Sequence, residues 1–288
     1  MHSSFPFDRE TRNPRPGTPG GTPVDLPEQR AVARRLYELG VSRLVLSILG
    51  RSGPMIARVS ATTVFCLLAI AGSANAAGKT RTRNVAIVLY DHVELLDFAG
   101  PGEVFAAAAR AGATGDEPAF RVYTVGRSKS PLISEGFVKI VPEFSIEDAP
   151  KPDLVVFPGG GVQSIVGDPA LMAWARSAVD SSEIAFSVCN GAFVLGSLGV
   201  LDGKTVTTHF GAMSRLRSSF PKVTVQEGRR FVDNGKIVTT AGVSAGIDGA
   251  LHVVARLLGR AAADETARYM EYRWAPEPYL AQSYASSK

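Results

Sequence analysis

Cysteine and histidine are scarce in this chain, and both shortages limit what the protein can be. Two cysteines among 288 residues cannot form the disulfide framework of a small secreted scaffold. The four histidines stand at positions 2, 92, 209 and 252 and do not have the spacing of metal ligands. The glycines at 159–161 lack the spacing of a dinucleotide- or phosphate-binding loop. We therefore predict no metal and no nucleotide or other cofactor.

An excess of basic charge is also missing from most of the chain. The formal net charge is +4, but residues 1–76 alone hold nine arginines, no lysine and five acidic side chains. The other 212 residues hold 22 basic and 22 acidic side chains and are therefore neutral. A neutral body has no basic patch with which to bind a phosphate backbone. No nucleic acid is expected as a partner.

The chain also lacks a long apolar run. The run at 61–72 has about twelve residues, whereas a membrane-spanning helix needs about 20. It follows Met55 and Arg58 and precedes the small residues 74–76, which gives the three parts of a secretory signal. We expect cleavage after Ala76, a periplasmic or secreted product, and no stable membrane anchor once the signal is removed.

These features divide the chain into three parts. Residues 1–54 begin with a stretch rich in Ser, Pro, Gly and Thr and are expected to be a disordered or mis-annotated extension. Residues 55–76 are the expected signal peptide, and residues 77–288 form one folded domain. Because Cys66 would leave with the signal, Cys189 would be the only thiol of the mature protein.

Short β-rich segments alternate with helical segments from residue 84 onward, which is typical of a parallel sheet flanked by helices. We predict an α/β fold, a single flavodoxin-like three-layer sandwich with helices on both faces of a mostly parallel sheet. A hairpin turn is expected at Asn234 and Gly235. Strands are predicted at 84–90, 120–126, 138–142, 153–161, 183–188, 204–209 and within 223–240, and helices at 97–112, 169–181, 192–199 and 246–259.

Three chemically interesting features follow buried strands of this predicted sheet. Asp97 follows the first, the glycines 159–161 follow the second, and Cys189 follows the third. The carboxyl ends of parallel strands lie at one edge of a sheet, and functional groups collect there. The sequence Ser-Val-Cys-Asn-Gly at 187–191 has the layout of a nucleophile elbow with sulfur in place of a hydroxyl. The start of the next helix is expected to favour the thiolate form of Cys189.

Each of these features also has a purely structural interpretation. Cys189 could be a buried core cysteine, and Asp97 could cap the helix that follows it.

Gly242 to Gly246 match a serine-nucleophile pattern, but no later Asp and His are spaced to complete a triad, so these glycines are expected to allow tight helix packing. Asp248 and His252, four residues apart, are expected to form a pair on a helix surface.

Five sequence blocks together resemble the DJ-1/PfpI superfamily, a group of class I glutamine amidotransferase-like proteins, and within it the isonitrile hydratases. The blocks are LLDFAGPGEVF (95–105), VVFPGGG (155–161), FSVCNGAFVLGSLGVLDGKTVTTHF (186–210), TTAGVSAGIDGALHVVARLLG (239–259) and EYRWAPEPY (271–279). The resemblance implies that Cys189 is the nucleophile and that Asp97 donates and accepts protons beside it. It also implies that the backbone N–H groups of Gly160 and Asn190 bind substrate or an oxygen on the sulfur, and that His209 lines the same pocket, although His209 could instead simply bond to backbone at a strand end.

The residue after the nucleophile departs from the family pattern. Isonitrile hydratases carry Thr there and the peptidase-like members carry His, whereas this chain carries Asn190. The absence of that His argues against a peptidase. Asn can form hydrogen bonds as Thr does, but its larger side chain would change the choice of substrate.

The resemblance implies a cysteine-dependent lyase (a hydro-lyase), and the signal-like segment implies that it is exported. Its substrate would be a small electrophilic molecule such as an isonitrile, which it would convert to the N-substituted formamide. The alternative is a protein without enzymatic activity on the same fold, either a thiol sensor of oxidative stress or a small-ligand binding protein. Members of the family commonly form dimers, so a homodimer is also expected.

Overall fold

The computed structural model describes residues 81–111 and 117–274. The expected extension 1–54 and signal peptide 55–76 lie outside the described residues, as does most of the block 271–279. No helix in the described part of the chain is both long enough and apolar enough to cross a membrane.

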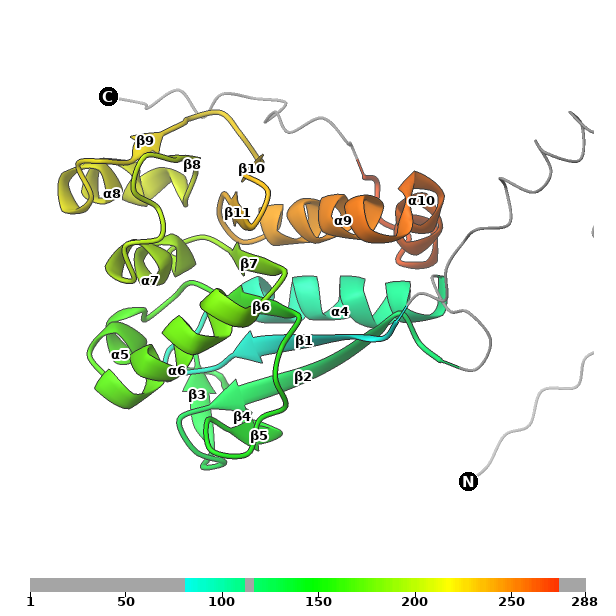
Figure 1. The fold of residues 1–288 in the computed structure, drawn as a ribbon, viewed down its shortest axis with the longest axis horizontal. Helices are drawn as coiled ribbons and strands as arrows, with labels where there is room; N and C mark the ends of the chain where they lie inside the picture. Colours follow the sequence, from blue (N-terminus) through cyan, green and yellow to red (C-terminus); the bar gives the residue numbers. More distant parts are fainter. Residues whose placement is uncertain (1–80, 112–116, 275–288) are drawn as a thin grey trace, which may run out of the picture. The chain divides into compact units, whose positions relative to one another are not determined.

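The centre of the fold is a seven-stranded sheet in the order β10-β11-β7-β6-β1-β2-β5 (Figure 1). Every neighbouring pair in it is parallel except the hairpin β10–β11. The strands are β1 (Arg83–Val88), β2 (Phe120–Gly126), β5 (Phe144–Ser145), β6 (Leu154–Phe157), β7 (Ile184–Ser187), β10 (Phe231–Asp233) and β11 (Ile237–Thr240). All residues of β6 and β7 are buried, as expected for central strands covered on both faces.

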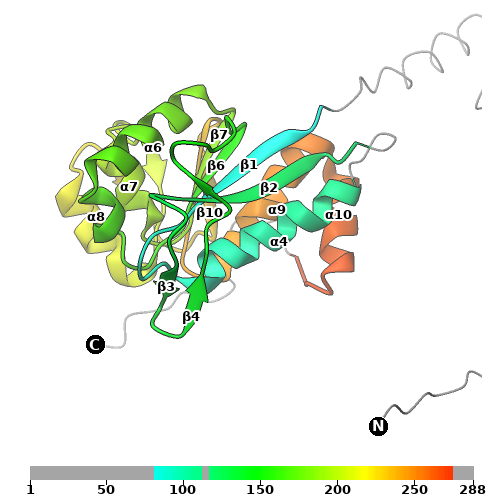
Figure 2. The same ribbon diagram turned by 90° about the horizontal axis from the view of Figure 1, so that it is seen from below.

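Helices cover both faces of this sheet (Figure 2). On one face, α4 (Leu95–Ala111), α9 (Ala245–Leu258) and α10 (Arg260–Tyr269) pack against one another. The other face carries α6 (Pro169–Ser181), together with the short helices α5 (Gln163–Val166) and α7 (Gly191–Ser197). The side chain of Asp168 caps α6 by accepting the N–H groups of Ala170 and Leu171, and Pro169 occupies its first turn.

Two small sheets stand apart from the central one. The hairpin of β3 (Leu132–Ser134) and β4 (Val138–Ile140) projects from one end of the molecule (Figure 2). The strands β8 (Thr205–Val206) and β9 (Thr224–Val225) flank the 3₁₀ turn Phe210–Ala212 and the helix α8 (Met213–Ser219).

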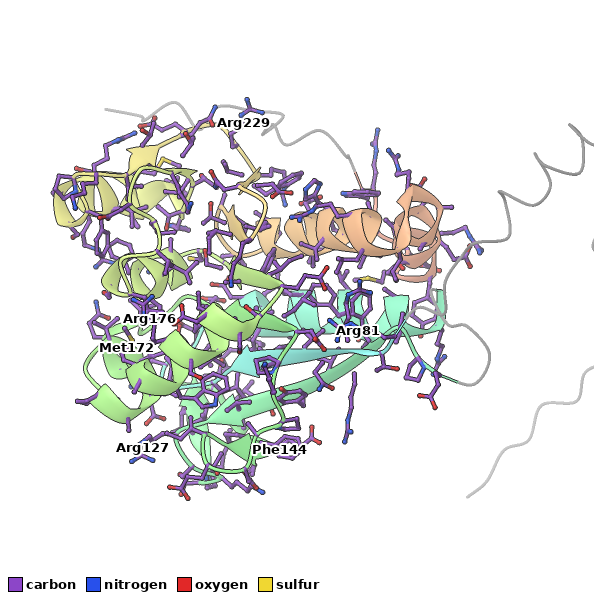
Figure 3. All side chains as sticks on the ribbon, in the orientation of Figure 1. Arg81, Arg127, Phe144, Met172, Arg176 and Arg229 are labelled. Atoms are coloured by element: carbon purple, nitrogen blue, oxygen red, sulfur yellow. The ribbon has the colours of Figure 1, made fainter. Side chains whose placement is uncertain are left out.

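Charged side chains join three neighbouring strands at the amino end of the sheet. Arg81, which lies just before β1 and is labelled in Figure 3, pairs with Asp153 at 2.8 Å. Arg83 pairs with Glu183 at 3.0 Å. Asp153 and Glu183 immediately precede β6 and β7. The loops that hold Asp97, the glycines 159–161 and Cys189 lie at the opposite, carboxyl edge of the sheet.

The predicted architecture is confirmed, with differences in individual elements. The α/β sandwich, the mostly parallel sheet and the 234–235 hairpin turn are present, and Gly235 has a φ of 80°. Helix α4 begins at Leu95, two residues earlier than predicted. The segment 204–209 gives only the two-residue strand β8, which joins the small sheet instead of the central one. Helix α10 is not among the predicted elements, because its sequence RAAADETARY holds alanines and polar side chains without a large aliphatic residue to mark a buried face.

Candidate active site

Cys189 lies on the tight turn between β7 and α7 in a strained backbone conformation. Its φ is +56°, a region that costs a residue with a side chain of the order of 1–3 kcal/mol. Two hydrogen bonds hold this conformation: the Cys189 N–H donates to the Ala241 carbonyl at 3.0 Å, and the Thr208 hydroxyl donates to the Cys189 carbonyl at 2.7 Å. The turn therefore has the geometry of a nucleophile elbow, and it holds the sulfur at the carboxyl edge of the sheet.

Asp97 lies in the first turn of α4 and is completely buried. Its Oδ2 accepts the backbone N–H of Gly159 at 2.8 Å, while Oδ1 has no hydrogen-bond partner of ordinary geometry in the described part of the chain. The interpretation of Asp97 as a helix cap is wrong, because the helix begins two residues before it and the carboxyl group points to the glycine loop. A buried carboxyl with one bonded oxygen is free to act on a neighbouring group.

Gly159 lies between the Asp97 carboxyl group and Cys189. A Cβ atom placed on Gly159 would lie 2.7 Å from Asp97 Oδ2, 2.8 Å from Cys189 Cβ and 2.7 Å from the Asn190 backbone nitrogen. Only glycine lets these three groups converge at such distances. The structure thus brings Asp97, Gly159 and Cys189 together, although they are up to 92 positions apart in the chain.

The two ionisable groups of the pair change each other's affinity for protons. Burial, with a further contribution from Glu94, raises the pKa of Asp97 to about 7, against hydrogen bonds from Gly159, Cys189 and Val243 that lower it. Burial first, and then the charge of Asp97, raise the pKa of Cys189 well above that of an ordinary thiol. The expectation of a thiolate is therefore wrong for the resting site: at neutral pH the sulfur keeps its proton and the carboxyl group beside it can accept it.

Asn190 contributes its main chain to the site. Its backbone N–H hydrogen-bonds to the Cys189 sulfur and lowers the thiol pKa, as does that of Val243, but neither overcomes the effect of burial. The Asn190 side chain does not cap α7, and its buried Oδ1 has no hydrogen-bond partner among the residues described. The role of Asn190 in binding substrate or an oxyanion remains a prediction.

Gly160 fixes the glycine loop against the start of α4. It forms an isolated antiparallel bridge with Val93, and a Cβ atom there would lie 2.3 Å from the carbonyl oxygen of His92. Its φ of +89° suits glycine. The contact of its N–H with a substrate remains a prediction.

His209 lies on the wall of a cavity of about 210 Å³. Its Nδ1 accepts the N–H of Gly211 at 3.2 Å, and burial lowers its pKa. The predicted bond to backbone is present. That His209 lines the substrate pocket stays a prediction. The cavity also includes Ala241 and Val243, the residues whose backbone groups bond to Cys189.

Tyr90 and Val243 belong to the site but are not found by sequence reasoning. The buried Tyr90 hydroxyl donates to the carbonyls of Pro158 at 2.5 Å and Gly159 at 3.0 Å and so fixes the glycine loop. Val243, with a φ of +51°, gives its N–H to both members of the pair. Tyr90 belongs to none of the motifs found in the sequence, and Val243 lies in the 242–246 segment only as its variable second position, so only the folded chain brings them to the site.

The rival interpretations of the segment 242–252 are resolved by side-chain contacts. Asp248 is 3% exposed and bonds to Arg230 and Tyr272, and His252 bonds to Asp233, so the expected Asp248–His252 surface pair is wrong. Gly246 packs closely against Val188, as predicted for a tightly packed helix. Among residues 81–111 and 117–274, no group of His, Cys, Asp and Glu side chains could hold a metal ion.

A cysteine on a strained strand-to-helix turn, with a buried acid beside it at the carboxyl edge of a parallel sheet, defines an α/β protein with a cysteine elbow. The model of the DJ-1/PfpI family matches residues 83–256, and the chain belongs to this family. It is 32% identical to the isonitrile hydratase of Pseudomonas putida over 193 residues, and this alignment covers 67% of this chain and 79% of that protein.

Other relatives show the same family and fold. The chain is 29% identical over 140 residues to the Parkinson disease protein 7 homolog of Danio rerio, covering 46% of this chain and 71% of that protein. Among solved structures, a THiJ/PfpI family protein from Pseudomonas syringae has a TM-score of 0.62 at 24% identity, covering 81% of this chain and 86% of its own. Drosophila melanogaster DJ-1beta has a TM-score of 0.56 at 19% identity, and the match covers 67% of this chain and 100% of that one. These structures are similar in fold.

Proposed function

We propose that the protein is a cysteine-dependent hydratase that converts an isonitrile, or a related small electrophile, to its N-substituted formamide. The observation that carries this proposal is the convergence of the Cys189 thiol and the buried Asp97 carboxyl across Gly159. The similarity to an isonitrile hydratase supports the choice of substrate.

The first half of the reaction uses the proton of the thiol. As Sγ of Cys189 attacks the terminal carbon of R–N≡C, the thiol proton passes to the Asp97 carboxylate, which delivers it to that same carbon. The product is a thioimidate, in which a new C–S bond and a new C–H bond join the former isonitrile carbon to the enzyme. A carboxyl with a pKa of about 7 is suited both to accept and to return this proton near neutral pH.

The second half of the reaction adds water. Asp97 takes a proton from a water molecule as the water oxygen bonds to the thioimidate carbon, and Asp97 then passes that proton to the nitrogen. The C–S bond then breaks, the sulfur regains the proton of the new hydroxyl group, and R–NH–CHO leaves. One water is consumed and no oxidant is needed. Backbone N–H groups of Asn190 and Val243, which bond to the sulfur, stabilise negative charge on it during bond making and breaking.

The direct test is an assay of the full chain with a small alkyl isonitrile. We expect a formyl proton signal to appear by NMR, and we expect a short-lived adduct on Cys189, with the mass of one intact isonitrile, by mass spectrometry. If no electrophile of a broad panel is converted while mild peroxide readily adds oxygen to Cys189, the sensor function replaces the enzymatic one. The protonated and 6% exposed thiol argues against ready oxidation.

The activity should depend on pH through the ionisation of Asp97. Below its pKa of about 7 the carboxyl group is protonated and cannot accept the thiol proton. We therefore expect kcat/KM to fall about tenfold for each pH unit below 7 and to stay level from about pH 7.5 to 9. Rates measured from pH 5 to 9, corrected for the uncatalysed hydrolysis of the isonitrile, check this. A rate that rises toward pH 5 would contradict the role of Asp97 as the base.

Export and dimer formation complete the proposal. The signal-like segment 55–76 supports a periplasmic or secreted protein. The β3–β4 hairpin supports a homodimer, because it exposes the apolar side chains of Ile133, Phe137 and Val141, with Phe137 70% exposed. Such a hairpin is more stable when a second copy covers it.

A further inference from the structure

The cavity beside the catalytic pair has a polar wall and an apolar wall. Phe210 and Met213 supply the apolar wall, and Arg230 and His209 supply polar groups. The remaining lining is the turn at 241–245, which leads into α9. Among residues 81–111 and 117–274, no acidic side chain lines the cavity.

Arg230 is held in place by contacts along one edge of its guanidinium group. Its Nε donates to Asp248 Oδ2 at 2.5 Å, and its Nη2 bonds to the same oxygen and to the Ser244 hydroxyl at 3.3 Å. The Tyr272 hydroxyl also donates to Asp248 Oδ2, at 3.0 Å. The contacts with Asp248 and Ser244 use Nε and Nη2, and Arg230 also bonds to the Tyr272 hydroxyl. An arginine fixed along one edge presents its other donors without further loss of side-chain entropy.

His209 supplies a second donor. Its Nδ1 accepts the N–H of Gly211, so the proton of the neutral ring is on Nε2. The ring is held between the Phe210 ring, whose centroid is 4.4 Å away, and Gly242, where an added Cβ atom would lie 2.2 Å from Cδ2. The His209 and Arg230 side chains both act as donors, and Asp248, the acid in contact with Arg230, is already bonded to Arg230 and Tyr272.

We propose that this cavity binds a carboxylate carried by the substrate, with Arg230 and His209 as the hydrogen-bond donors. Phe210 and Met213 would contact the carbon atoms between the carboxylate and the reactive group. Since it names the substrate class of the catalytic pair, this inference rests on the proposed function. The substrate would be a small electrophile with a carboxylate a few bonds from the carbon that Cys189 attacks.

Paired substrates that differ only in charge test the proposal. With the full chain, we expect kcat/KM for isocyanoacetate to exceed that for methyl isocyanoacetate at least about tenfold. Arg230→Lys keeps a cation beside Asp248 but removes the planar guanidinium fork, and it should bring the ratio of kcat/KM for the acid to that for the ester close to one. Arg217→Lys is the matched control, because Arg217 bonds to Glu227 and does not line the cavity. It should leave both rates unchanged.

A binding measurement separates this inference from the proposed function. N-formylglycine and its methyl ester are titrated by NMR into the Cys189→Ala chain, with and without Arg230→Lys, and only the free acid should bind, in a manner that depends on Arg230. Turnover of both isonitriles at equal rates, with equal binding of acid and ester, would overturn the carboxylate site and leave the hydratase intact. Binding of N-formylglycine without any isonitrile turnover would support the carboxylate site and contradict the hydratase function. If neither ligand binds to the chain with Arg230 intact, the carboxylate site is wrong whether or not Arg230→Lys folds.

Discussion

Replacing Asp97 with asparagine is expected to lower kcat at least about a thousandfold, and Cys189→Ala is expected to remove turnover completely. Asparagine can still accept the Gly159 N–H through its amide oxygen, so the position of the side chain should be kept. What is lost is the group that accepts the thiol proton and returns it to carbon. Single-turnover rates by NMR of the formyl proton check both variants. An Asp97→Asn rate within tenfold of the wild type would show that another group moves the proton.

The same Asp97→Asn change should stabilise the fold at pH 8. The pKa of Asp97 is about 7 in the folded chain and 3.8 in its ordinary state, so between these values the folded chain keeps a proton that the unfolded chain has lost. Stability from this group is complete below about pH 4 and is lost as the pH rises through 7. At pH 8 the buried charge costs the fold about 2 to 4 kcal/mol, which asparagine avoids. Denaturant unfolding should show this gain at pH 8 and none at pH 4.

Gly191→Ala is expected to have the largest effect on stability. A Cβ atom on Gly191 would lie 1.9 Å from the carbonyl oxygen of Phe157 and 2.8 Å from that of Pro158, both backbone atoms of the strand β6 and the loop after it. Neither can move without breaking the sheet or the glycine loop. We expect a loss of about 4 kcal/mol or more in the free energy of unfolding, or a chain that does not fold.

Gly199→Ala is the control for this prediction. Gly199 has a positive φ of 69°, but no atom lies within 4 Å of an added Cβ. Its replacement should cost only about 1 kcal/mol through backbone strain. Denaturant midpoints of the two variants separate steric overlap from strain. Equal losses would show that the turn at 191 can relax.

The sequence predicts the layers of the fold well because its central strands are continuous apolar runs. The strands β6 and β7 lie within the predicted segments, and Asp168 and Pro169 give α6 a clear start. The convergence of Asp97 and Cys189 also follows from the sequence, because parallel strands bring their carboxyl ends to one edge. The glycine between them is part of the same prediction.

The protonation state of Cys189 and the partners of Asp248 and His252 could not be predicted in this way. A helix start after Cys189 argues for a thiolate, but the sequence does not reveal that the sulfur and Asp97 are both buried, and burial dominates. Asp248 and His252 are four positions apart and suggest a pair. Tertiary contacts with Arg230 and Asp233 from the β10 region give each a different partner.

The backbone bonds that hold Cys189 come from segments made later in translation. Its N–H bonds to Ala241, its carbonyl accepts from Thr208, and Val243 bonds to its sulfur. A nascent chain that has emerged from the ribosome only as far as α7 lacks all three, and its cysteine is an ordinary, unconstrained thiol. The reactive geometry therefore arises only when the final third of the polypeptide has been synthesised and has docked.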